Sequence, residues 1–73
     1  MTYEILSKAV KALEGTDYEG YISDLKFTEI NDQGNDRKLY IAWCEDQSFT
    51  VTEKGVVLVA DYLKGTATWY RCC

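Results

Sequence analysis

The segment 31–36 constrains the fold more than any other feature of this sequence. It reads N-D-Q-G-N-D and separates two runs that are rich in apolar residues. Asn, Asp and Gly suit tight turns because they accept a positive φ or hydrogen-bond to their own backbone. A turn of this kind between two apolar runs predicts an antiparallel β-hairpin.

The runs on either side of this turn have strand patterns. Residues 24–30 alternate, with Leu25 and Phe27 between polar positions, so one face of this strand is expected to be covered. Residues 38–44 are apolar at nearly every position, which is typical of a strand in the middle of a sheet. A short turn then leads to a third strand over 48–52. Because short connections join antiparallel neighbours, the three strands are expected in meander order.

Residues 3–14 have the periodicity of a helix with one apolar stripe. Thr2 precedes this segment as a side-chain cap, and Gly15 follows it as a terminator in the left-handed conformation. We therefore expect this helix to pack on one face of the sheet. The stripe consists of Ile5, Leu6, Ala9, Val10 and Leu13.

Residues 53–64 fit two structures. Their apolar spacing suits a helix that ends at Gly65, and T-E-K-G at 52–55 is similar to the strand-to-helix junction of many winged-helix regulators. The alternative is a strand, because 56–59 reads V-V-L-V and Gly55 can take the left-handed position of a three-residue hairpin loop. We favour the helix. DNA binding does not follow from the resemblance, because no basic recognition helix is present. Residues 66–71 are expected to form a C-terminal edge strand.

These elements predict one α+β domain over 1–73. The chain is 47% hydrophobic, which is enough for one core, but a domain of 73 residues buries only about 60% of its unfolded surface. No run approaches the roughly 20 apolar residues of a membrane span, and the N-terminus has no basic patch before an apolar run. We therefore expect a cytoplasmic protein that does not bind membranes.

Charge is unevenly distributed along the chain. Twelve acidic and eight basic residues give a net charge of −4. Segment 14–46 holds nine acids and three bases, a net charge of −6, and the flanks hold three acids and five bases, a net charge of +2. An acidic segment repels phosphate backbones, so direct nucleic-acid binding is not expected. It favours a protein partner with a basic surface, and the candidate docking residues are Asp17, Glu19, Asp32 and Asp36.

Aromatic residues are the second candidate binding feature. They make up 14% of the chain, and Tyr and Trp are the side chains that most often anchor protein interfaces. Trp43 lies in the middle of an expected central strand and is assigned to the core. The aromatic candidates for partner binding are Tyr18, Tyr21, Trp69 and Tyr70.

No catalytic, metal or cofactor pattern is present in the sequence. Histidine is absent, and the three cysteines include no Cys-x-x-Cys pair, so a zinc site lacks its usual ligands. Segment 31–36 does not match a calcium-binding loop in either of two registers. Cys44 is expected to be buried. Cys72 and Cys73 resemble the lipidation signal of Rab GTPases in those two residues only, and we expect a reduced, reactive tail.

The sequence thus predicts a small, acidic, non-enzymatic protein-binding module that acts as an inhibitor or an adaptor. One alternative is a phage or mobile-element inhibitor of host nucleic-acid machinery, of the anti-restriction or anti-CRISPR type, in which carboxylates mimic nucleic acid. A second alternative is a structural subunit that forms homodimers or larger assemblies through an edge strand. A third is a small redox protein that uses its cysteines.

Overall fold

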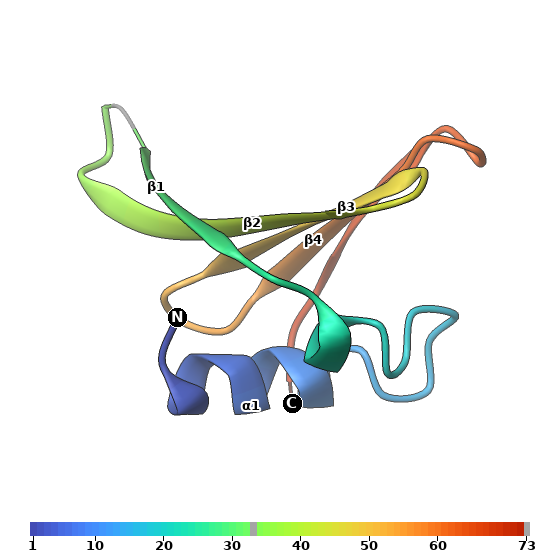
Figure 1. The fold of residues 1–73 in the computed structure, drawn as a ribbon, viewed down its shortest axis with the longest axis horizontal. Helices are drawn as coiled ribbons and strands as arrows, with labels where there is room; N and C mark the ends of the chain where they lie inside the picture. The colour runs from blue at the N-terminus through green and yellow to red at the C-terminus, as the bar shows by residue number, and fades with distance from the viewer. Residues whose placement is uncertain (33, 73) are drawn as a thin grey trace.

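A single antiparallel sheet with one helix beneath it makes up the computed structural model, which describes residues 1–32 and 34–72. The helix α1 spans Tyr3–Ala12, and a short 3-10 turn η1 spans Ile22–Asp24. The α+β class and the antiparallel meander are confirmed, with strand order β1-β2-β3-β4-β5 (Figure 1). The expectations for residue 33 in the first turn and for Cys73 lie outside the described residues. The strands are β1 (Thr28–Asp32), β2 (Arg37–Cys44), β3 (Gln47–Thr52), β4 (Val57–Asp61) and β5 (Thr66–Tyr70).

Helix α1 forms where the capping residues predicted it. The Thr2 hydroxyl oxygen accepts a hydrogen bond from the Ile5 N–H at 3.4 Å, which satisfies one of the N–H groups left free in the first turn. Glu4 in the first turn and Lys11 in the last turn both have the sign that the helix dipole favours. The chain leaves the helix through Gly15, whose φ is +78°. The helix therefore presents a defined apolar stripe to the sheet.

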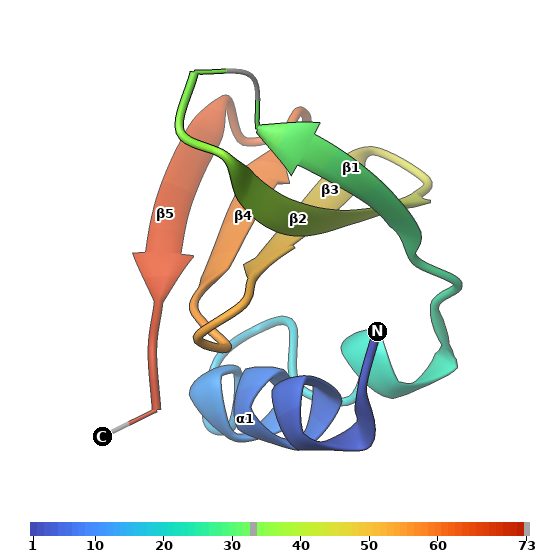
Figure 2. The same ribbon diagram turned by 90° about the vertical axis from the view of Figure 1, so that its left-hand side faces the viewer.

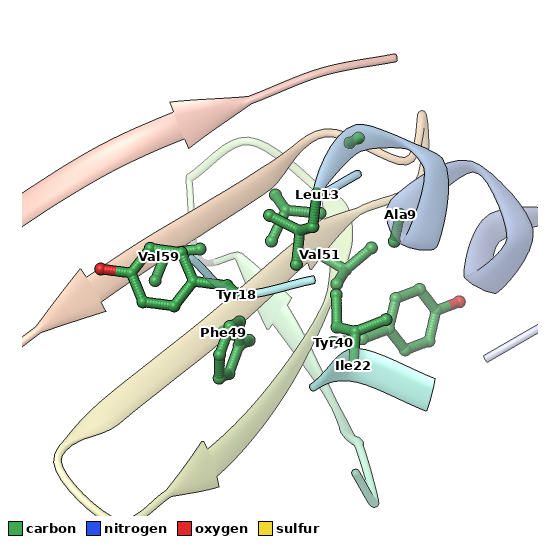
Figure 3. Packing of buried hydrophobic residues seen from close by; sticks show 10 residues of the cluster. Ala9, Leu13, Tyr18, Ile22, Tyr40, Phe49, Val51 and Val59 are labelled. Atoms are coloured by element: carbon green, nitrogen blue, oxygen red, sulfur yellow. The ribbon is translucent and has the colours of Figure 1, made fainter. Parts of the chain in front are cut away.

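The core lies between this stripe and one face of the sheet, which we call the inner face. Phe49, Val51 and Val57 have no exposed surface, and Ala9 of α1 packs into the same cluster. Figure 3 shows Phe49 and Val51 of β3 with Tyr18, Leu13 and Ile22 gathered around them. Figure 1 shows α1 and η1 on this side of the sheet only. No helix or strand of the described residues lies over the opposite face, which we call the outer face.

The expected helix over 53–64 is wrong, because this segment forms a tight turn followed by β4. The Gly55 N–H donates to the Thr52 carbonyl oxygen, and the Thr52 N–H donates to the Val56 carbonyl oxygen, both at 2.9 Å. Gly55 has a φ of +82°, which is the left-handed conformation that the alternative prediction of a hairpin loop placed at this residue. Val57 and Val59 are buried on the inner face, while Leu58 faces outward between them. Alternating burial and β-branched side chains therefore favour the strand over the helix.

Three smaller expectations are also corrected. The first strand begins at Thr28 rather than residue 24, because η1 and an extended segment bring Leu25 and Phe27 against the core before pairing starts. Trp43 is 65% exposed instead of buried. Cys44 is half-buried rather than fully buried. The first difference shows that core contact and strand pairing start at different residues along this segment.

Candidate functional site

The outer face is a continuous surface across all five strands, and it carries charge at one end only. Directly paired residues of antiparallel strands share a face, so the register assigns each side chain to one side. The charged end holds Asp32 and Arg37. All other strand residues on this face are uncharged. Those residues are Thr28, Ile30, Leu39, Ile41, Trp43, Ser48, Thr50, Thr52, Leu58, Ala60, Ala67 and Trp69.

One end of this face carries an aromatic pair. The rings of Trp43 and Tyr62 are stacked, with centroids 5.8 Å apart and planes 10° from parallel. Both rings remain more than half exposed, although the Tyr62 hydroxyl lies 3.4 Å from the Ser48 hydroxyl on the sheet. The stack therefore holds two large rings in place without removing them from water, which reduces the side-chain entropy lost when a partner binds.

The other end of the outer face borders a hollow of about 430 Å³. Leu39, Val56 and Trp69 supply apolar surface, and the indole of Trp69 is 56% exposed. The four cations of the lining outnumber the single acid, which is Glu53. These cations are Arg37, Lys38, Lys54 and Arg71.

Two of these cations are available to a ligand. Arg37 is paired with Asp32 at 2.9 Å, and Lys38 with Glu29 at 3.7 Å. Lys54 and Arg71 form no ion pair with any described residue. Both also line a second hollow of about 340 Å³ that includes Lys8. A chain with a net charge of −4 thus gathers unpaired positive charge at one end of its outer face.

Of the predicted aromatic candidates, Tyr18 is buried and belongs to the core. Its hydroxyl donates to the Asp61 carboxylate at 2.9 Å, and this hydrogen bond together with burial raises the pKa of Tyr18. Burial alone would raise the pKa of Asp61. Hydrogen bonds from Tyr18 and from the N–H groups of Leu63 and Lys64 instead hold it below its usual value. This buried network ties the loop after α1 to the β4–β5 turn.

The other sequence candidates fall in three places. Tyr21 is 43% exposed beside the core, Tyr70 is half-buried with its ring 6.2 Å from that of Tyr18, and Trp69 is on the outer face. Asp17 and Glu19 are exposed in the loop after α1, and Asp17 accepts a hydrogen bond from the Lys64 ammonium at 3.1 Å, which raises the pKa of Lys64.

Asp32 and Asp36 lie at the β1–β2 turn. Hydrogen bonds from Arg37 and Asn35 lower the pKa of Asp32, and Asp36 is exposed. Figure 1 places this turn and the loop after α1 at opposite corners of the molecule. The structure therefore does not bring the four acidic candidates together on one face.

Sequence reasoning missed three exposed large side chains on or beside the outer face, which are Ile30, Trp43 and Tyr62. The alternation in 38–44 separated Trp43 from Tyr40, but both sets were apolar, so alternation did not show which set the helix covers. Tyr62 was assigned to a helix that does not form. The signal that was available is that no residue of 39–43 or 48–52 carries a charge, so both faces of these two strands lack charged side chains.

Across residues 1–32 and 34–72, no group of three or more His, Cys, Asp or Glu side chains is arranged to hold a metal ion. No helix among the same residues is long and apolar enough to cross a membrane. No protein-family profile, characterised protein or solved structure matches this chain.

Proposed function

We propose that this chain is a non-enzymatic module that binds a partner protein through the outer face of its sheet. The observation that carries the proposal is an uncharged surface across five strands that exposes Trp43, Tyr62 and Trp69 and has no helix or strand of the described residues over it. Exposed apolar patches of this kind mark interaction sites, and Trp and Tyr supply most of the binding energy at protein interfaces. By covering a surface of its partner, the module acts as an inhibitor or an adaptor.

The charges around the outer face define the chemistry of the partner. Lys54 and Arg71 stand beside the apolar hollow and have no acidic neighbour to pair with among the described residues. An apolar partner surface with one or two carboxylates on this side would place those carboxylates against Lys54 and Arg71. Charge complementarity of this kind fixes orientation and raises the association rate. The partner we propose is therefore an apolar protein surface with acidic residues at its rim.

The test is capture from the source cells with four forms of the protein as bait, followed by binding kinetics with the purified partner. The forms are the wild type, Trp69→Thr, the charge reversal of Lys54 and Arg71 to Glu, and Tyr3→Ser. Tyr3 is 84% exposed on the helix side, so Tyr3→Ser is the matched control for losing an exposed aromatic residue. We expect the control to retain the partner. We expect Trp69→Thr to speed dissociation, and the charge reversal to slow association.

Two results would contradict the proposal. One is a captured partner that both outer-face variants retain and that is lost when Asp17 and Glu19 are changed to Lys. That result would instead support an acidic docking surface in the loop after α1 for a basic partner. The other is a set of NMR shift changes that fall only on the helix side when the purified partner is added.

A further inference from the structure

The two edges of the sheet differ in the chemistry that controls strand pairing. Among the described strands, β1 pairs only with β2, and β5 pairs only with β4. An edge strand exposes a row of backbone N–H and C=O groups, and natural proteins usually block such a row with charged side chains, proline, a bulge or a covering segment. The presence or absence of these features therefore indicates which edge is built to stay unpaired.

The β1 edge carries charged residues of this protective kind. Glu29 and Asp32 are two of its five residues, and they form ion pairs with Lys38 and Arg37 of the neighbouring strand. A second strand that approached β1 would have to desolvate these charges. The β1 edge is therefore expected to stay unpaired.

The β5 edge has none of these features. Its five residues, T-A-T-W-Y, include no charge and no proline, and each one pairs with a single residue of β4, so the strand contains no bulge. Residues 66–69 are exposed. Figure 2 shows β5 at the outside of the sheet, with no described element along its free side. This edge is open to a further strand.

We infer that the β5 edge pairs with β5 of a second copy of this chain, antiparallel, around a two-fold axis at Thr68. This centre is the one that pairs all five residues of β5. It puts Thr68 opposite Thr68, and Ala67 opposite Trp69 of the second copy. Both members of the second pair lie on the outer face, where the indole covers the small Ala67 side chain. Thr66 lies opposite Tyr70 on the inner face.

The charges near β5 are compatible with this pairing. Arg71 follows the strand and falls opposite Gly65, beyond the paired segment. Lys64, the nearest cation at the other end, is already paired with Asp17 at 3.1 Å. No like charges therefore face each other within the pair of strands. The joined sheet has ten strands, and the two outer faces become one surface. The inference does not depend on the proposed function, because a single copy also presents an outer face.

Disulfide trapping tests the register. In a background of Cys72→Ser and Cys73→Ser, we expect mild oxidation of Thr68→Cys to give a covalent dimer of twice 8.4 kDa. Only a residue on the two-fold axis faces its own copy. Thr66→Cys is the matched control, because the two Thr66 positions lie about 13 Å apart along the strands, too far for a disulfide. Equal trapping of both variants, or trapping of the control alone, would overturn the assigned register.

Sedimentation equilibrium tests the association itself. We expect the wild type to dimerise, and Thr68→Lys to weaken the dimer by about tenfold or more, because it puts two ammonium groups opposite each other. Asn31→Lys on the β1 edge is the control and is expected to dimerise like the wild type. A wild type that stays monomeric up to about 1 mM would overturn the inference. So would a dimer that Asn31→Lys disrupts and Thr68→Lys does not.

Discussion

The inner and outer faces of the sheet are built from the same strands by the same alternation, yet they differ in what covers them. On β3, Phe49 and Val51 are fully buried under α1, while Thr50 between them faces outward and is half-buried. On β2, Tyr40 and Ala42 are buried, and Trp43 is 65% exposed. The helix has one apolar stripe and can cover one face only. The apolar residues of the inner face therefore form the core, whereas Trp43 on the outer face stays largely exposed.

The sharpest test of this difference is a pair of adjacent substitutions on β3. Phe49→Ala removes a fully buried ring from the inner face and is expected to cost about 3–5 kcal/mol of unfolding free energy, which is most of the stability of a small domain. Thr50→Ala, one residue along on the outer face, is expected to change it by about 0.5 kcal/mol or less. Urea denaturation followed by circular dichroism measures both, and equal losses would remove the distinction between the faces.

The β3–β4 turn tests the contact between the sheet and α1. Gly55 has a φ of +82°, and a Cβ added there would clash with the Cβ of Lys8, which is fixed to the helix backbone. We expect Gly55→Ala to cost about 2 kcal/mol or more, since the left-handed conformation alone costs an L-residue about 1–2 kcal/mol. The control is Gly20→Ala, where φ is +85° and no heavy atom lies within 4 Å of the added Cβ. If both variants lose equal stability, the contact with Lys8 contributes nothing.

Acid is expected to lower the stability of the folded protein through Asp61, which is buried on the inner side of the sheet. Its pKa in the folded protein is below the ordinary value of 3.8, so the unfolded chain binds this proton more readily. The stability that Asp61 contributes is present above pH 3.8 and is lost as the pH falls through the lower, folded value. Tyr18→Phe removes one of the hydrogen bonds that lower this pKa, so the folded and unfolded pKa values of Asp61 move closer together. The variant should therefore have a lower Tm than the wild type above pH 3.8, and its Tm should fall less as the pH is lowered.

The matched comparison for this acid effect is Asp32, whose pKa is also lowered but whose main partner, Arg37, has a side chain that is 59% exposed. An exposed ion pair contributes little to stability. We therefore expect Asp32→Asn to change the pH profile of Tm less than Tyr18→Phe does. A larger change from Asp32→Asn would show that the buried network is not the main acid-sensitive element.

The sequence was sufficient for elements whose signals are local. Helix α1 has its own cap and terminator, and the turn after β1 carries two residues of types that accept a positive φ, Gly34 and Asp36. The prediction for residues 53–64 was wrong because this segment has both the apolar spacing of a helix and a run of residues that favour strands. Pairing with β3, in which Thr50 lies opposite Leu58, decides between them, and that pairing depends on tertiary contacts.

The candidate binding surface was harder to predict than the fold, for a related reason. Of the eight sequence candidates, two lie on the outer face: Trp69 in its uncharged part and Asp32 at its charged end. Tyr18 looked like an exposed loop residue, but its hydroxyl reaches Asp61, which is 43 positions away in the chain. Trp43 looked like a core residue because both sides of β2 are apolar. A sequence pattern identifies two faces of a strand, but only the position of α1 determines which one is buried.

The smallest expected effects on folding come from substitutions of the two exposed tryptophans of the outer face. Trp43→Thr and Trp69→Thr keep a strand-forming residue at each position. We expect Trp43→Thr to cost about 0.5–1.5 kcal/mol, since it removes the stack on Tyr62, and Trp69→Thr to cost less than about 1 kcal/mol. Thermal unfolding measures both changes. The same two variants should bind the partner more weakly than the wild type. Phe49→Ala should still bind it, at a temperature at which this variant stays folded. If the outer-face variants instead unfold as readily as Phe49→Ala, the exposed tryptophans stabilise the fold, and the assignment of the outer face to binding is wrong.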